Sequence, residues 1–425
     1  MKPTFHTCRL SNGLRIIHEE RDSEVMYCGY VMGVGTRHEA AAESGMTHFI
    51  EHMTFKGTEH RRAWQISNGL ERVGGELNAF TNKQETVYCA TVLQPDFRRA
   101  VDLLTDIVFH STYPQAEIDR EVEVICDEID SYKDSPGEII FDEFEEILFP
   151  GADLGRDILG DAQRLRSYTT DDALRFTARH YRPDNAVFYA YGRADFRRLV
   201  GWLQGMFGLK PEPITENCDE TGIFRLPEKP DLLPEAPAGR EIFRDKGTHQ
   251  AHVLLGCTAY GGCHPRRYAM MLLSNLLGGP GMNARLNMLL RERAGLVYTV
   301  ESNYSAYVDV GVWSVYFGCD AHDVSRCVRM VRRELQRCAE SPLSPRQLAA
   351  AKQQLIGQIG IAQEQHESHA ITMGKAYARY GLRRDPATLA ERIQALTAKE
   401  VQRAAAEIFR PERLTLLAYR TPSSR

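Results

Sequence analysis

The chain has 425 residues, enough for about three domains of average size. Its composition of 43% hydrophobic, 9% aromatic and 26% charged residues is close to the globular average and excludes a disordered, collagen-like or low-complexity protein. The 52 basic and 57 acidic side chains give a net charge of −5, so no overall positive field favours nucleic acid as a main partner.

The cysteine and hydropathy patterns bear on the cellular compartment. The ten cysteines include no Cys-x-x-Cys pair, which predicts reduced core thiols in a reducing compartment. The first residues lack the apolar stretch of a signal peptide, and no apolar run of about 18 residues predicts a membrane span. We therefore expect a cytoplasmic protein with no membrane partner.

Strand-like and helix-like segments alternate along the first 210 residues. Asn12-Gly13 predicts the turn of a β-hairpin. Strands are expected at residues 8–10, 14–17, 27–34, 76–81 and 86–92, and helices at 47–55, 62–73, 95–109 and 114–132. The last two helices each carry a proline near the start, where its missing N–H costs no hydrogen bond.

The second half of the chain repeats the first. Residues 168–192 align with residues 396–420, with seven identities, and both contain a helix, an Arg-Pro break and an apolar strand. Six prolines between residues 211 and 237 indicate a linker. This pattern predicts an α+β fold of two homologous α/β domains, each a sheet covered by helices, at 1–210 and 241–425, related by internal duplication and joined by a proline-rich linker at 211–240.

One motif is typical of a metal-binding site. His48, Glu51 and His52 are spaced i, i+3 and i+4, so a helix places both imidazoles on one face, one turn apart. Zinc is the natural ion for such a pair, but catalytic zinc sites usually have three protein ligands. The order His-x-x-Glu-His matches the inverzincin pattern. Two histidines satisfied within a helix are the alternative.

Three segments around this motif resemble the pitrilysin or insulysin-type zinc metallopeptidases, the family that includes the mitochondrial processing peptidase. GMTHFIEHMTFKGT at residues 45–58 is similar to the zinc-helix block of the family. GGELNAFTNKQETVYCATV at 74–92 is similar to its active-site edge strand, and EIDREVEVICDEI at 117–129 to its third-ligand helix. The resemblance extends over nearly the whole chain.

The resemblance implies one zinc ion per chain, held by His48, His52 and Glu128. Glu51 would act as general base on a water whose pKa the metal lowers. Glu121, seven residues before Glu128 and on the same helix face, would support catalysis by orienting a ligand histidine. A solvated helix carboxylate is the alternative for Glu121.

The expected edge strand has a role in binding substrate. An extended peptide can add to such a strand through main-chain hydrogen bonds, which gives affinity with little sequence selectivity. The residues expected to bind substrate here are Leu77, Asn78, Ala79 and Phe80. A substrate contact of Asn78 is implied by the resemblance, and turn chemistry after Gly74-Gly75 is the alternative.

The second half lacks the metal residues, because Ala351 and Gln358 align with the two glutamates. The resemblance instead implies that Arg291 and Tyr298 hold the substrate backbone and stabilise the oxyanion. A helix-end arginine and a strand tyrosine are the alternative. Since two subunits close the chamber in family members of this length, we expect a homodimer with composite sites. A heterodimer with an inactive partner is the alternative.

Other signals modify or limit this hypothesis. Residues 117–146 contain thirteen acidic and two basic side chains, which would favour basic peptides if they line the chamber, whereas a solvated helix face is the alternative. Gly278-Gly279-Pro280-Gly281 is not followed by Gly-Lys-Ser/Thr, so nucleotide binding is not expected. The pairs His249/His252 and His366/His369 are interpreted as surface histidines.

The sequence therefore predicts a zinc-dependent metalloendopeptidase that hydrolyses peptides or unfolded segments in a closed chamber. A non-catalytic structural or assembly subunit of the same fold is one alternative. A peptidase that is active only with a separate partner subunit is another.

Overall fold

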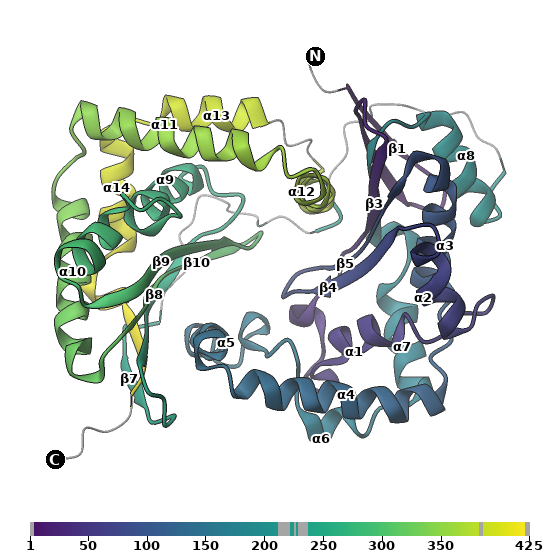
Figure 1. The fold of residues 1–425 in the computed structure, drawn as a ribbon, viewed down its shortest axis with the longest axis horizontal. Coiled ribbons are helices and arrows are strands. Elements are labelled where there is room, and N and C mark those ends of the chain that lie inside the picture. The colour runs from purple at the N-terminus through teal and green to yellow at the C-terminus, as the bar shows by residue number, and fades with distance from the viewer. Residues whose placement is uncertain (1–3, 211–221, 225–226, 228–236, 382–385, 421–425) are drawn as a thin grey trace. The chain divides into compact units, whose positions relative to one another are not determined.

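A computed structural model describes residues 4–210, 222–224, 227, 237–381 and 386–420 (Figure 1). The chain forms two compact units, and neither is a continuous half of the sequence. Unit 1 comprises Met1–Asp130, Arg156–Arg225 and Ala362–Arg384, and unit 2 comprises Ser131–Gly155, Leu226–Ile361 and Asp385–Arg425. The expected domain limits describe the sequence repeat and stay a prediction, and most of the expected linker at 211–240 lies outside the described residues.

The sheet of unit 1 has the strand order β1-β2-β6-β3-β5-β4. These strands are β1 (Thr4–Arg9), β2 (Arg15–Glu20), β6 (Ala186–Gly192), β3 (Val25–Met32), β5 (Thr86–Leu93) and β4 (Glu76–Thr81). All neighbours are antiparallel except β2 and β6. The predicted hairpin is confirmed, since β1 pairs with β2 around Gly13 at φ 92°. Of the strands that the structure describes, only β5 pairs with β4, which therefore forms an edge of the sheet.

Helices cover both faces of this sheet. On one face, α3 (Phe97–Phe109), α1 (Met46–Met53) and α8 (Phe196–Met206) contribute to a large core that includes Tyr30 and Phe188. On the other face lies α12 (His366–Tyr380), seen end-on beside β3 in Figure 1. A side chain at Gly374 would come within 2.6 Å of Tyr189, so glycine allows α12 to approach the sheet.

Two buried carboxylates tie α12 to the strands. Glu85 is fully buried and pairs with Lys375 Nζ at 3.1 Å and Arg379 Nε at 2.8 Å. Burial raises the pKa of Glu85, but the charges of Arg379 and Lys375 have a larger effect and lower the pKa overall. The interpretation of His369 as a surface histidine was wrong, because its Nε2 lies 2.7 Å from the buried carboxylate of Glu19.

The sheet of unit 2 has the strand order β7-β11-β8-β10-β9, with β9 at its edge. Its strands are β7 (Glu241–Arg244), β11 (Thr415–Tyr419), β8 (Ala251–Tyr260), β10 (Val310–Cys319) and β9 (Val297–Ala306). Helices α9 (Arg267–Gly278), α10 (Val324–Glu340) and α14 (Ala398–Ile408) pack on one face around Trp313. Helix α5 (Pro136–Leu148) packs on the other face through Ile140 and Phe144.

The predicted repeat is visible in both units. Helix α7 (Thr170–His180) leads to β6 as α14 leads to β11, with a short 3-10 turn at the Arg-Pro break in each case. The two helices even begin alike, since Thr169 Oγ1 accepts from the Asp172 N–H and Thr397 Oγ1 from the Glu400 N–H. The α+β fold of two duplicated units, each a sheet covered by helices, is confirmed.

The remaining helices complete the two units. They are α2 (Ala63–Glu71), α4 (Gln115–Lys133), α6 (Ala162–Leu165), α11 (Pro345–Ala362) and α13 (Pro386–Ala395). Over the described ranges, no helix combines the length and apolarity that crossing a bilayer requires. The nine cysteines that the structure describes are free, and only Cys263 among them is not buried.

The buried ion pairs between α12 and Glu85, the residue before β5, predict a large stability effect. Glu85→Ala leaves Arg379 and Lys375 without their buried counter-charge, so we expect the free energy of unfolding to fall by about 3–5 kcal/mol. Urea denaturation followed by fluorescence measures this change. As a control, Glu123→Ala removes an exposed partner of Arg166 and should shift the midpoint far less. Equal shifts for both variants would contradict the assigned role of Glu85.

Candidate metal centre

Helix α1 carries the predicted motif and is anchored at its start. Gly45 precedes the helix at φ 77°, a conformation that favours glycine. The N–H groups of Gly45 and Thr47 donate to the buried carboxylate of Glu39, at 3.0 and 2.8 Å. Because Phe49 and Ile50 are buried in the core of unit 1, the opposite face of α1 presents the histidines.

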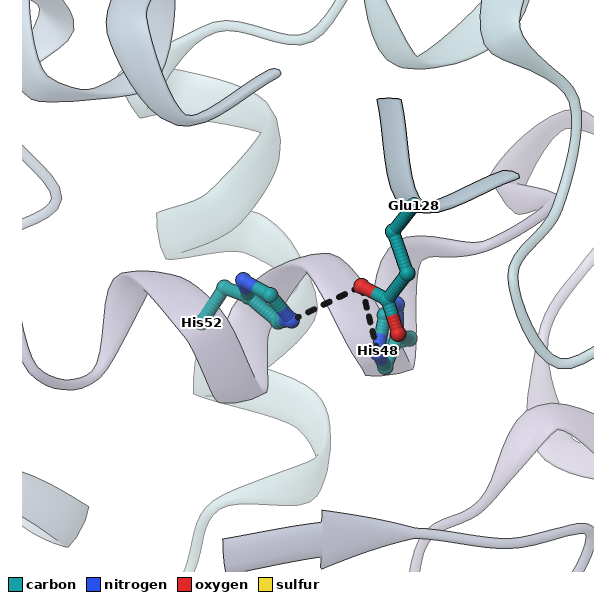
Figure 2. Close-up of side chains that lie close together, drawn as sticks. All are labelled: His48, His52 and Glu128. Atoms are coloured by element: carbon teal, nitrogen blue, oxygen red, sulfur yellow. Dashed lines mark ion pairs between the residues drawn. The ribbon is translucent and has the colours of Figure 1, made fainter. Parts of the chain in front are cut away.

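The structure brings the three predicted metal ligands together. His48 and His52 lie one turn apart on α1, with ring centroids separated by 4.6 Å, and Glu128 reaches them from α4 (Figure 2). Glu128 Oε2 lies 3.9 Å from His48 Nε2 and 3.5 Å from His52 Nε2. One donor atom of each residue falls within 4.8 Å of the other two.

These donors fit a zinc ion. With zinc–ligand bonds of about 2.0–2.1 Å, neighbouring ligand atoms of a tetrahedral site are roughly 3.3 Å apart, close to the observed separations. Burial, followed by the charge of His52, lowers the pKa of His48 to about 3, so this ring is neutral as a metal ligand must be. Two histidines and a glutamate also leave a fourth position for water or substrate.

Glu121 is buried beside the cluster and is not a solvated helix carboxylate. Its Oε1 lies 3.0 Å from His52 Nδ1, and its Oε2 lies 2.6 Å from Lys56 Nζ. Burial raises the pKa of Glu121, but the contacts with His52 and Lys56 outweigh it and lower the pKa overall. A carboxylate that accepts from Nδ1–H leaves Nε2 of His52 free to face Glu128. The sequence did not indicate Lys56 as a member of this arrangement.

Glu51 is also buried and lies on the same helix. The hydroxyl of Thr81, the last residue of β4, donates to Glu51 Oε2 at 2.6 Å. Burial raises the pKa of Glu51, whereas the Thr81 hydrogen bond and the charge of His52 act in the opposite direction. No local pattern could reveal this contact, because the two residues are 30 positions apart in the chain.

The expected substrate residues lie on the edge strand β4. Leu77, Ala79 and Phe80 are partly buried, and Asn78 is exposed. Asn78 lies inside the strand and not in a turn, and its Oδ1 accepts from the Ala79 N–H at 2.8 Å. Among the described residues, no strand lies on the side of β4 that faces away from β5. This edge has the geometry that strand addition requires.

Arg291 and Tyr298 lie in unit 2 and line one cavity. Arg291 belongs to a π-helical segment, Asn287–Arg293, and Tyr298 to the edge strand β9. The cavity has a volume of about 440 Å³ and is also lined by residues 278–282, 287 and 299–303. The side chain of Tyr298 is exposed. Both side chains are therefore accessible to a ligand in this cavity.

A second group of potential ligands has a different role. His60, Asp106 and His110 also lie close together, but Oδ2 of Asp106 accepts from Thr58 Oγ1 at 2.7 Å and pairs with Arg61 at 2.6 Å. His60 Nδ1 lies 2.6 Å from Oδ1. Both carboxylate oxygens thus have partners, and the guanidinium of Arg61 would repel a cation. This group ties the loop after α1 to α3.

Comparisons with known proteins identify the family of the chain. Residues 15–162 match the family described as Insulinase (Peptidase family M16), and residues 167–355 match the family described as Peptidase M16 inactive domain. An uncharacterized zinc protease of Streptomyces coelicolor is 33% identical, covering 96% of this chain and 87% of that protein. An uncharacterized zinc protease of Bacillus subtilis is 32% identical, covering 94% and 93% respectively.

Solved structures show the same fold. A protease from Helicobacter pylori superimposes with a TM-score of 0.86 at 19% identity, covering 99% of this chain and 100% of that one. A structure described as the peptidase M16 inactive domain from Pseudomonas fluorescens gives 0.84 at 18% identity, covering 99% of each chain. The resemblance inferred from the motifs is confirmed, and the chain belongs to peptidase family M16.

Proposed function

We propose that the protein is a zinc-dependent metalloendopeptidase that hydrolyses peptides or unfolded segments. The observation that carries this proposal is the convergence of His48, His52 and Glu128 beside a buried, non-ligand carboxylate, Glu51. The names of the curated relatives support zinc as the ion. Hydrolysis at such a site needs a metal, a proton acceptor and a means of holding an extended chain, and unit 1 has residues suited to each.

His48, His52 and Glu128 would hold one zinc ion per chain. When bound, zinc supplies Lewis-acid chemistry, lowering the pKa of a coordinated water and polarising a carbonyl oxygen. Glu121 accepts a hydrogen bond from His52 Nδ1, which leaves Nε2 of His52 as the atom that would bind the metal. The ion pair with Lys56 keeps Glu121 charged. The role of these two residues is therefore to hold His52 in the correct tautomer and orientation.

Glu51 is the proposed general base. One of its oxygens, Oε2, is engaged by Thr81, so Oε1 is the oxygen that accepts a proton from the attacking water. The same carboxyl then returns this proton to the nitrogen of the leaving amine. Burial raises the pKa of Glu51, which makes the carboxylate a better proton acceptor than an exposed one.

The substrate would bind as an added strand on β4. Main-chain groups of Leu77, Asn78, Ala79 and Phe80 would hold the peptide backbone, which excludes folded substrates because only an extended chain can pair this way. Arg291 and Tyr298 would hold the substrate backbone and stabilise the oxyanion with a guanidinium and a phenol.

We also propose a preference for basic peptides, based on the acidic residues at 117–146. Ion pairs formed by some of these residues make the expected preference weaker. Within the acidic segment, Glu123 pairs with Arg166, and Glu143 pairs with Arg244 and Lys246. These contacts neutralise part of the charge that the sequence alone suggests. Any preference should therefore depend on ionic strength, as expected of a long-range field.

We also propose a homodimer in which each site combines the metal residues of one copy with Arg291 and Tyr298 of the other. This arrangement follows from the length of the chain and its family, and a heterodimer with an inactive partner is the alternative. In both arrangements the second subunit would complete the site rather than merely adjoin it.

Zinc content tests the ligand assignment. Purified wild-type protein should contain about one zinc ion per chain, and His48→Ala should lose it because two protein ligands hold zinc too weakly. Elemental analysis after dialysis measures this content. His60→Ala is the matched control, since it removes a histidine from the group around Asp106 and should leave zinc bound. Loss of zinc in the control alone would reverse the assignment.

Turnover tests the general base. Glu51→Gln keeps the shape of the side chain and the metal ligands but removes the proton acceptor, so kcat should fall by about 100- to 10,000-fold with zinc content unchanged. Cleavage of a diverse peptide library, followed by mass spectrometry, provides the measurement. If zinc-loaded wild-type protein cleaves no peptide, the result favours one of the two alternatives, a structural subunit or a peptidase that needs a separate partner subunit.

Mixing two inactive variants tests the composite site. Glu51→Gln and Arg291→Ala should each be nearly inactive alone, yet a mixed dimer contains one site with both residues intact. Random exchange of subunits should therefore restore about a quarter of wild-type activity. If both residues act within one chain, mixing restores nothing, and light scattering establishes whether dimers were present.

A further inference from the structure

We propose that Thr81 is a positioning residue whose hydroxyl holds Glu51 in the orientation required for proton transfer. The inference rests on the proposed function and extends it to a residue outside the metal ligands. Its structural basis is the contact between the last residue of β4 and the carboxylate of α1, with Oγ1 of Thr81 2.6 Å from Oε2 of Glu51. A hydrogen bond to a charged acceptor at this distance is among the stronger types.

The neighbouring hydrogen bonds indicate that the hydroxyl proton of Thr81 is donated to Glu51. A threonine hydroxyl has one hydrogen to donate. The neighbouring hydroxyl, of Thr86, donates to the carbonyl of Val34 at 3.0 Å and lies 3.4 Å from Thr81 Oγ1. Within the described ranges, Thr81 is the only hydrogen-bond partner of the Glu51 carboxylate. The orientation of this buried carboxylate therefore depends on one side chain.

The contact has a consequence for the reaction. A carboxylate without a partner can rotate about its terminal bond, which is only weakly restricted. Fixing Oε2 leaves Oε1 in a defined position, and proton transfer requires an acceptor within about 2.6–3.2 Å of the donor. Thr81 is β-branched and lies at a strand end, so its own rotamer is restricted. The hydroxyl is thus a rigid support for the base.

Thr81 also connects the base to the substrate strand. β4 is in register with β5 through the pairs Thr81↔Thr86 and Phe80↔Val87, and its other side is open. If a peptide adds to this open side, the same six-residue strand places both the peptide backbone and, through Thr81, the proton acceptor. A displacement of this strand would therefore move both together.

A purely structural role for Thr81 has different consequences. If the contact only held α1 against β4, its loss would reduce thermal stability and zinc affinity along with activity. If it positions Glu51, its loss would reduce kcat and leave KM, zinc affinity and stability nearly unchanged. The two roles are therefore separable by measurement.

The test compares three variants with wild type. Thr81→Val keeps the shape and removes the donor, and we expect kcat to fall by about 10- to 100-fold with KM and zinc affinity unchanged. Thr81→Ser restores a donor and should keep kcat within a few-fold of wild type. Thr91→Val makes the same change on β5 opposite the other end of β4 and should have no effect. Zinc affinity is measured by chelator competition.

A double-mutant cycle completes the test. Adding Thr81→Val to Glu51→Gln should cause no further loss of the residual rate, because Thr81 acts only through Glu51. Full kcat in Thr81→Val, a further loss in the double variant, or release of zinc from Thr81→Val would each overturn the inference. If Thr81→Val does not fold, two other measurements test the inference. They are the kcat of Thr81→Ser compared with wild type, and the double-mutant cycle of Thr81→Ala with Glu51→Gln. An inactive wild type would instead overturn the proposed function itself.

Discussion

The candidate site depends on the packing of helix α1 against the first sheet. This helix is short and buried on most sides, with Phe49, Ile50 and Met53 in the core and Glu39 accepting hydrogen bonds at its start. Because one face is fixed in the core, the other must present His48, Glu51 and His52 in one direction. Rigid placement of this kind is what a metal centre needs, since ligand positions must hold to within a fraction of an ångström.

Three carboxylates around α1 are suited to different proposed roles because their surroundings differ. Glu128 is half-exposed and points at two histidine nitrogens, which suits a ligand. Glu121 is clamped between His52 and Lys56, which suits a support. Glu51 is buried and has one hydrogen-bond partner in the described part of the chain, the hydroxyl of Thr81, which suits a proton acceptor with one free oxygen. The same functional group in three settings is thus suited to three proposed roles.

The duplicated fold is completed by an exchange of helices. Helix α12 comes from the second half of the sequence and covers the sheet of unit 1, whereas α5 comes from the first half and covers the sheet of unit 2. Each sheet would otherwise expose an apolar face, including Val31 and Tyr189 in unit 1 and Leu254 in unit 2. Neither half of the chain therefore contains all of the core it needs.

The sequence by itself determined the features whose signals are local. Spacing within one helix placed His48, Glu51 and His52 on one face, turn and strand patterns located the β1–β2 hairpin and β4, and the repeat predicted the duplicated fold. Glu128 and Glu121 were assigned by family resemblance, since nothing local connects them to α1. Only the tertiary structure revealed Lys56 beside Glu121, Thr81 beside Glu51, and the exchange of α5 and α12. Such contacts join residues far apart in the chain, and long-range packing leaves no periodic pattern from which they could be predicted.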